Sequence, residues 1–255
     1  MNTLFIAQHE LRRIFVSPLA WAILAVIQLM LGVVFLLTIV DLMSNPGILM
    51  DETVGVTEIV TGSLFGFGSL LFLLVVPLLT MRMFSEERKS GSLDLYLSAP
   101  ISLTELVFGK FLGLLGFLVV MLALASIMPW SLLPASPLDT GRLFSGMLGL
   151  LLMMAAFGAA GIFISSLTEQ PVIAAVVSLV VLLLLWLVGF FKDWTMPWFG
   201  GQELAAGKPF GYLSMTNHFD SFLLGLFDTA DLIYYLLFIA VFLALTIQRL
   251  DMERH

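Results

Sequence analysis

Residues 19–40 read LAWAILAVIQLMLGVVFLLTIV, a run of 22 residues without a single charged side chain. An α-helix rises about 1.5 Å per residue, so about 20 apolar residues cross the roughly 30 Å hydrocarbon core of a bilayer. The run is therefore predicted to be a membrane-spanning helix. A cleaved signal peptide is the alternative, because Arg12 and Arg13 precede the run. The apolar core of a signal peptide has only about 7–15 residues, and no A-x-A site follows here.

Similar uncharged runs continue along the chain, at residues 64–81, 111–130, 143–167, 172–191 and 232–247. The last run is too short to cross the bilayer. Its helix is expected to begin earlier, with Asp228 as the N-cap and Asp231 in the first turn, since acids stabilise that end of a helix. The sequence thus predicts an all-α polytopic membrane protein, with six transmembrane helices in one domain over residues 1–255.

The composition supports this class. Hydrophobic residues make up 60% of the 255 residues and charged residues only 11%, against about 25% charged in a soluble protein. The chain has no cysteine, which excludes disulfides, thiolate metal sites and thiol catalysis. Its net charge of −7 argues against a nucleic-acid partner, because such a partner requires a basic surface.

Positive residues accumulate on the cytoplasmic side of membrane proteins, which predicts the orientation. With both termini in the cytoplasm, the inner segments contain Arg12, Arg13, Arg82, Arg88, Lys89, Lys110, Arg249 and Arg254. The outer segments then contain only Arg142, Lys192 and Lys208. Acids balance the inner charges, so the whole negative net charge is expected on the outer side.

Two segments outside the spans have distinctive patterns. In residues 1–17, apolar side chains recur at helical spacing, at Leu4, Ala7, Leu11, Ile14 and Phe15. This pattern predicts an amphipathic helix in the inner interface that turns into the membrane near Pro18, with a soluble overhang as the alternative. Residues 192–231 are rich in aromatics. They are expected to form an extracytoplasmic segment that partly re-enters the headgroup region as short helices, or else plain interfacial anchors.

Charge is concentrated in residues 82–102, between the second and third spans. Ser85 is expected to cap a short helix that Gly91 ends, and Ser92 to cap a second short piece. Ser102 should then begin the next helix, with Glu105 in its first turns. Antiparallel helices need a connection of only about 2–8 residues, so the segment is interpreted as a folded cytoplasmic element with a docking surface. A charged loop at the headgroups is the alternative.

Small residues inside the spans predict close helix contacts. They lie in the pairs Gly62-xxx-Gly66 and Gly109-xxx-Gly113 and in the AAFGAAG run that contains Gly158 and Gly161.

No catalytic, cofactor or metal site is predicted. The chain lacks the G-x-x-x-x-G-K-[ST] loop that binds nucleotide phosphates, so any ATP and Mg²⁺ must be bound by another polypeptide. His9, His218 and His255 have no metal-binding spacing, and Ser145 lacks a nucleophile motif. The predicted spans contain no ionisable residue, which disfavours an ion-coupled carrier.

These features resemble a family, the membrane subunits of ABC-2 type exporters. The resemblance rests on the order of the spans, the amphipathic N-terminal helix and the stretch EERKSGSLDLYLSAPISLTELVFGK at residues 86–110. The tail HFDSFLLGLFDTADLIYYL, residues 218–236, looks like the subgroup of gliding-motility permeases and the related nitrous oxide reductase maturation permeases.

The resemblance implies a permease subunit of a bacterial inner-membrane exporter, itself catalytically inert. Residues 82–100 would be a coupling element seated on an ABC ATP-binding subunit, through Glu86, Glu87, Arg88, Gly91, Ser92, Leu93 and Asp94. A second, smaller contact would involve Thr168, Glu169 and Gln170. Two permease copies, or a permease and a homologue, would face each other, and an auxiliary protein with an extracytoplasmic domain is a further possible partner. A structural subunit of a motility or assembly machine is the alternative.

Overall fold

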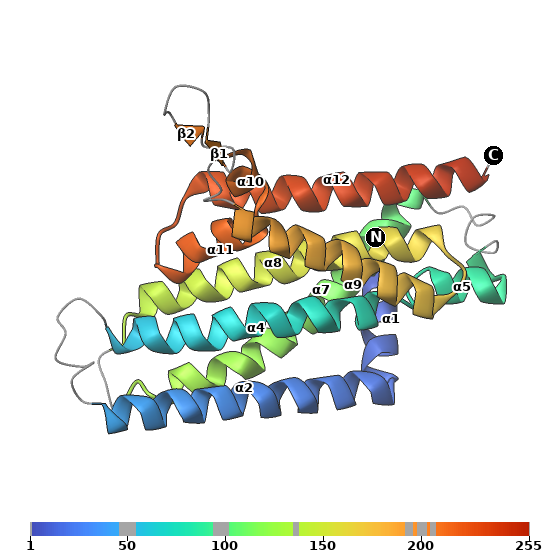
Figure 1. The fold of residues 1–255 in the computed structure, drawn as a ribbon. Coiled ribbons are helices and arrows are strands. Elements are labelled where there is room, and N and C mark those ends of the chain that lie inside the picture. Colours follow the sequence, from blue (N-terminus) through green and yellow to red (C-terminus); the bar gives the residue numbers. More distant parts are fainter. Residues whose placement is uncertain are drawn as a thin grey trace.

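The computed structural model describes residues 2–45, 55–93, 102–134, 138–191, 196–197, 203–204 and 208–254. In this part of the chain, six helices are long and apolar enough to cross a membrane. They are α2 (Pro18–Ser44), α4 (Val56–Thr80), α7 (Leu103–Trp130), α8 (Thr140–Leu167), α9 (Pro171–Leu187) and α12 (Thr229–Arg254). They run alongside one another as a bundle (Figure 1). The predicted all-α polytopic membrane protein is confirmed.

Two of the spans begin eight residues before their apolar runs. Helix α4 begins at Val56 rather than at residue 64, and α7 begins at Leu103 rather than at residue 111. Charged residues do not stop a helix when its end is capped. At α7, the Ser102 hydroxyl accepts a hydrogen bond from the Glu105 amide at 3.2 Å, and the Glu105 carboxylate accepts one from the Ser102 amide. This reciprocal capping box confirms the expected start of α7 at Ser102.

The expected start of α12 is also confirmed. The Asp228 carboxylate accepts a hydrogen bond from the Ala230 amide at 2.9 Å, and Asp231 lies in the first turn.

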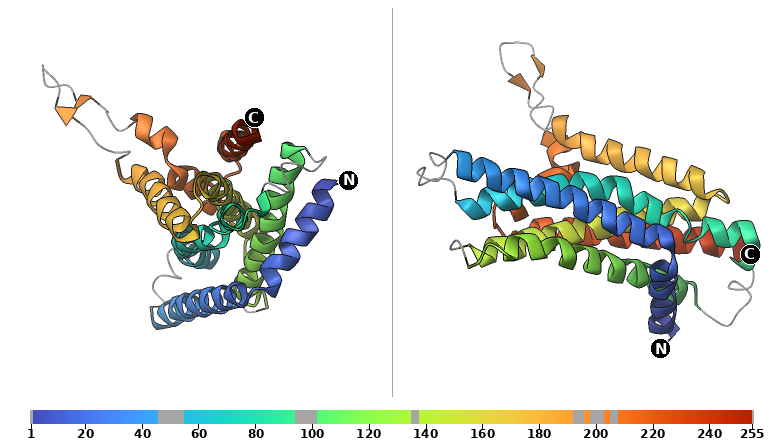
Figure 2. Two further views of the ribbon diagram at one scale, coloured as in Figure 1. Left: turned by 90° about the vertical axis from the view of Figure 1, so that its right-hand side faces the viewer. Right: turned by 90° about the horizontal axis from the view of Figure 1, so that it is seen from below.

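Helix α8 lies at the centre of the bundle and packs against α4, α7, α9 and α12. Every residue of its AAFGAAG run is buried, so small side chains allow the neighbouring helices to approach closely. Helices α2 and α9 lie at the outside (Figure 2). Their large apolar side chains are exposed, for example Leu29 and Leu36 on α2 and Val176 on α9. Such surfaces are stable only against lipid or against another apolar chain.

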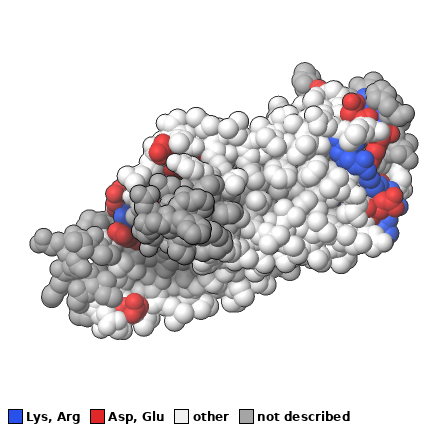
Figure 3. Space-filling model, turned by 45° about the horizontal axis from the view of Figure 1, so that its top comes forward, with Lys and Arg blue, Asp and Glu red and all other residues white. Residues whose placement is uncertain are grey.

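Charged side chains gather at the two ends of the bundle and leave an uncharged band between them (Figure 3). One end combines acids with Lys and Arg, whereas the acids prevail at the other end (Figure 3). This arrangement is that of a membrane protein whose uncharged band lies in the hydrocarbon.

Helix α1 (Asn2–Val16) crosses the mixed-charge end of the bundle instead of running along it (Figure 2). The chain turns at Ser17, and Pro18 is the first residue of α2. Because Pro has no amide hydrogen to donate, it is favourable at the first position of a helix. On α1, Leu4 and Phe5 stay exposed, whereas Ile6 and Leu11 pack towards the core.

The segment predicted to lie outside the membrane, residues 192–231, follows η1 (Val188–Phe191) and contains short elements in its described part. They are β1 (Met196–Pro197), β2 (Glu203–Leu204), α10 (Lys208–Leu213) and α11 (Met215–Leu223). The two-residue strands pair antiparallel. Helix α11 buries Met215, Phe219 and Phe222 against the spans, with α8 as its main neighbour.

Glycines on α7 set the contact with α1. A Cβ atom at Gly109 would lie 2.6 Å from the Ile6 Cγ2, and one at Gly113 would lie 2.7 Å from the Glu10 Cβ and 2.9 Å from the Ala7 carbonyl oxygen. By contrast, nothing in the described residues lies within 4 Å of a Cβ at Gly62 or Gly66. That predicted small face therefore has no partner in the described part of this chain.

Replacing Gly113 by Ala is expected to push α1 off α7, because the three nearest atoms that the new methyl would meet are all backbone or Cβ atoms of α1. Overpacking of this kind costs about 1–3 kcal/mol. The melting temperature of the purified protein should therefore fall. Gly62→Ala is the control and should leave the melting temperature unchanged; equal values for the two variants would contradict the close contact of α1 with α7.

Candidate functional site

The strongest candidate site is a short helix, α5 (Ser85–Ser90), at the mixed-charge end of the bundle. Gly91 ends it with φ +72°, in the left-handed region, where a residue with a Cβ is unfavourable. The expected end at Gly91 is confirmed. The expected cap at Ser85 is wrong. Phe84 occupies the N-cap position, and the Ser85 hydroxyl instead donates to the Met81 carbonyl in the preceding turn.

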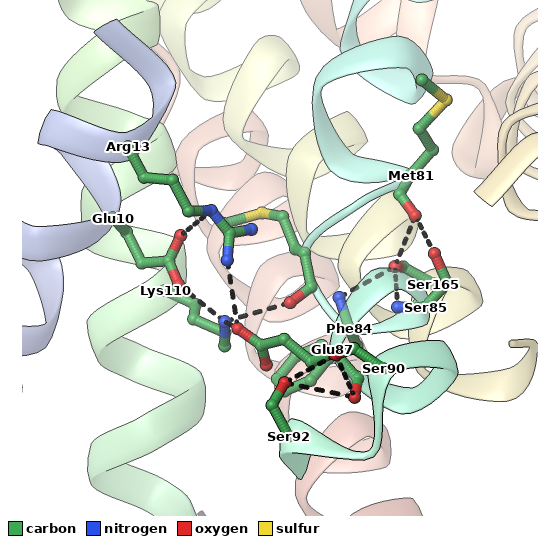
Figure 4. Close-up of polar contacts among 11 residues, drawn as sticks. Glu10, Arg13, Met81, Phe84, Ser85, Glu87, Ser90, Ser92, Lys110 and Ser165 are labelled. Atoms are coloured by element: carbon green, nitrogen blue, oxygen red, sulfur yellow. Dashed lines mark hydrogen bonds and ion pairs between the residues drawn. The ribbon is translucent and has the colours of Figure 1, made fainter. Parts of the chain in front are cut away.

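Helix α8 holds the start of α5. The Ser165 hydroxyl accepts hydrogen bonds from the amides of Phe84 at 3.1 Å and Ser85 at 3.2 Å, and it donates to the Met81 carbonyl at 3.1 Å. One buried side chain thus satisfies three backbone groups where α4 turns into α5 (Figure 4).

The C-terminal helix α12 also contacts α5. The Arg88 guanidinium lies 2.8 and 2.7 Å from the two carboxylate oxygens of Glu253, and it donates to the Ser166 carbonyl at 2.5 Å. Glu253 also pairs with Arg249 at 3.0 Å. Arg88 therefore joins α5 to α8 and α12 from the side opposite α1.

A buried cluster of four charges connects α5 with α1 and α7; we call it the Lys110 cluster, and it consists of Glu10, Arg13, Glu87 and Lys110. The Lys110 ammonium lies 2.6 Å from the Glu10 Oε1 and 2.6 Å from the Glu87 Oε1, and it donates to the Met83 carbonyl at 3.0 Å. These are three acceptors for the three N–H donors of an ammonium. Figure 4 shows them converging on Lys110.

Arg13 completes the cluster. Its guanidinium lies 3.1 Å from the Glu87 Oε1 and 3.3 Å from the Glu10 Oε2. Two positive and two negative side chains therefore balance. Lys110 is 1% exposed, Glu10 3% and Glu87 5%. Removing charges from water costs several kcal/mol per ion, so a group this buried is stable only when its partners are all present.

The structure separates the residues predicted to contact an ATPase into two sets. Glu86 and Gly91 are exposed, together with Lys89 and Ser90 between them, whereas Glu87 and Leu93 are buried. Ser92 is half-buried, and its hydroxyl donates to the Glu87 carbonyl at 3.3 Å. Arg88 is half-buried against α12. Ser92 and Leu93 are helical, whereas Asp94 and the rest of the predicted second helical piece lie outside the described residues.

The second predicted contact, Thr168, Glu169 and Gln170, forms the loop between α8 and α9. Glu169 and Gln170 are exposed. Because Ser165 and Ser166, at the end of α8, bond directly to α5, this loop and α5 lie at the same end of the bundle. The structure therefore brings the two predicted contact segments to one surface.

The sequence did not predict which residues contact the buried side of α5. They are Glu10, Arg13, Lys110, Ser165, Ser166 and Glu253. Lys110 was expected only in an inner segment, and its burial was not predicted. One feature of the sequence could have indicated the cluster: Lys110 lies on the glycine face of α7. Because glycines mark a close helix contact, a charge on that face is buried and requires a partner.

The remaining predicted glycines lie where α8 meets its neighbours. A Cβ at Gly158 would approach the Leu114 Cδ2 to 2.8 Å, and one at Gly161 would overlap the Thr80 side chain.

The opposite end of the bundle has its own polar contacts. Arg142 lies 3.0 Å from the Glu58 carboxylate and donates to the Leu223 carbonyl at 2.8 Å. The His218 Nδ1 lies 2.6 Å from the Asp231 Oδ1, and its ring stacks on Tyr234. Here His218 packs between helices. No group of three metal-binding side chains occurs among the described residues.

A bundle of lipid-facing helices with a folded, charged element at one end defines a polytopic membrane protein. The pattern of the ABC-2 family transporter proteins matches residues 4–253, and the chain belongs to this family. It is accordingly a permease subunit of an ABC transporter, a class of membrane subunit that assembles with an ABC ATP-binding subunit. None of the curated proteins matches the chain.

Replacing Lys110 by Met is expected to leave Glu10 and Glu87 buried without their ammonium, a loss of about 3–5 kcal/mol when one partner of a buried pair is removed. The melting temperature should fall sharply. The triple variant Lys110→Met/Glu10→Gln/Glu87→Gln removes the three most buried charges, leaves only the partly exposed Arg13 charged, and should recover part of the loss. Lys89→Met, on the exposed side of α5, is the control. A Lys110→Met variant as stable as this control would contradict a buried charge cluster.

Proposed function

We propose that this permease moves its substrate out of the cytoplasm and that α5 transmits the motion of the ATP-binding subunit to the spans. The observation that carries the proposal is the two-sided character of α5. Its exposed side offers Glu86 and Ser90 to a partner, and its buried side is bonded to α1, α7, α8 and α12.

A force applied to the exposed side of α5 would therefore reach several spans at once. Glu87 passes it to α7 and α1 through Lys110, and Arg88 passes it to α12. In this proposal Glu86, Gly91 and the loop at Glu169 form the docking surface, and Glu87 and Arg88 act as positioning residues behind it.

The charge distribution supports the orientation that we propose. The end that carries α5 also carries Arg12, Arg13 and Arg249 and the last turn of α12. Because positive residues accumulate in the cytoplasm, α5 and both termini would lie on that side of a bacterial inner membrane. The substrate path would form between two copies of the chain, or between it and a homologue.

The C-terminal pattern at residues 218–236 supports placing the chain in the gliding-motility and nitrous oxide reductase maturation subgroup. In the described structure this stretch contributes His218, Asp231 and Tyr234 to one packed contact. In that subgroup an auxiliary protein with an extracytoplasmic domain would be a further partner.

Reversing the charge of Glu86 tests the docking surface. Glu86→Lys should weaken binding of the ATP-binding subunit about fivefold, the effect of one exposed ionic contact of about 1 kcal/mol, and should lower permease-stimulated ATP hydrolysis. Asp251→Lys is the matched control, because it makes the same charge change on an exposed residue of α12 at the same end.

Binding and ATP hydrolysis that respond equally to both variants, or to neither, would contradict a specific docking role for this face of α5. Substrate movement by vesicles that contain no ATP-binding subunit would instead support an ion-coupled carrier.

A further inference from the structure

A cavity of about 370 Å³ lies beside α5, between α1, the start of α2 and the end of α4. Its apolar lining includes Leu19, Leu78 and Leu79, and its polar lining includes Arg82, Glu86 and Glu87. Leu19 and Leu78 are also exposed on the lipid-facing surface of the bundle, at 38% and 41%. The cavity therefore joins the lipid-facing surface to the charged end.

A residue near the cavity indicates where it lies across the thickness of the bilayer. Trp21, two residues after Leu19, is exposed and donates its indole hydrogen to the Phe15 carbonyl at 2.7 Å. An exposed Trp near the end of a span is typical of the headgroup level of a bilayer. The charged side chains of the cavity thus lie where lipid headgroups would be.

Some of the charged side chains that line the cavity are paired within the protein, and others are not. Arg13 and Glu10 belong to the Lys110 cluster and are paired. Arg82 and Glu86 are exposed, and neither forms an ion pair or hydrogen bond within the described part of the chain. The Glu87 Oε2 is buried at the same cavity and has no hydrogen-bond partner among the described residues.

The unpaired groups, Arg82, Glu86 and the Glu87 Oε2, are complementary to one kind of lipid headgroup. A guanidinium suits a phosphate, and carboxylate oxygens suit a primary ammonium with its three N–H donors. From this we infer that, in the permease free of its ATP-binding subunit, the cavity binds the phosphoethanolamine headgroup of a phospholipid. Arg82 lies at the phosphate, Glu86 and the Glu87 Oε2 at the ammonium, and Leu19, Leu78 and Leu79 along the first part of an acyl chain.

The chemistry discriminates between headgroups. An anionic phosphatidylglycerol would bring its charge to Glu86 and Glu87 without an ammonium to neutralise them. Phosphatidylcholine offers a cation but no N–H donor for a carboxylate oxygen. Of these three lipids, only phosphatidylethanolamine offers a phosphate to Arg82 and an N–H donor to Glu86 and Glu87.

The test uses the full-length permease, without the ATP-binding subunit, so that its outcome is independent of α5 docking. The protein is reconstituted in vesicles of equal parts phosphatidylethanolamine, phosphatidylglycerol and phosphatidylcholine and then extracted in mild detergent. Mass spectrometry measures the lipids retained. Phosphatidylethanolamine should be enriched about tenfold over the other two, the factor expected for one charge-assisted hydrogen bond.

Arg82→Gln should lower the retention of all three lipids, because each carries the phosphate that Arg82 binds, and Glu86→Gln should reduce the preference over phosphatidylcholine. Arg12→Gln is the control, because Arg12 is an exposed cation on α1 outside the cavity lining. Unchanged melting temperatures would show that the variants are folded.

Preferential retention of phosphatidylglycerol, equal retention of all three lipids, or Arg82→Gln and Glu86→Gln behaving as Arg12→Gln would each overturn the inference. Competition by soluble glycerophosphoethanolamine distinguishes the source of the headgroup. If this compound at micromolar concentration does not displace the lipid, the ligand is a membrane lipid. If it does displace the lipid, the inference of a lipid ligand is overturned and the site binds a soluble phosphoethanolamine compound instead.

Discussion

The ammonium of Lys110, buried between the carboxylates of Glu10 and Glu87, is the interaction on which the mixed-charge end of this permease depends. Each carboxylate comes from a different element, α1 or α5, and the Lys from α7. None of these helices can move away without leaving a charge in a low-dielectric environment. Such a cluster adds little net stability compared with an apolar core, but breaking it is costly. Its effect is therefore to specify one arrangement of the three helices.

Two further features around this cluster also fix the arrangement of the helices. The glycine face of α7 does so by close packing, and the two serines at the end of α8 do so by hydrogen bonds. Gly109 and Gly113 let α1 approach until the Glu10 carboxylate reaches Lys110, which a larger residue would prevent. Ser165 fixes the turn from α4 into α5. Helix α5 is only six residues long, and a helix of that length is unstable alone. Its stability comes from these neighbours, which makes it a rigid part of the bundle.

The sequence predicted the spans well because a bilayer imposes a length and a polarity that one uncharged run displays by itself. The start of α7 at Ser102, the start of α12 at Asp228 and the end of α5 at Gly91 were also predictable, since caps and positive-φ glycines act over a few residues. The Lys110 cluster was not, because its partners lie 100 and 23 residues away. Nor could local rules show that Ser85 donates to Met81 instead of capping α5.

If the Lys110 cluster joins the three helices, α5 moves together with α1 and α7 during the ATP cycle. The chain has no cysteine, so spin labels can be placed directly at Lys89→Cys on α5 and Gln8→Cys on α1, both exposed positions. Their distance distribution is measured by pulsed electron spin resonance in the assembled transporter, without nucleotide and with ATP trapped. We predict the same narrow distribution in both states, broadened by Lys110→Met. A distance that changes between the two states with the cluster intact would contradict the claim.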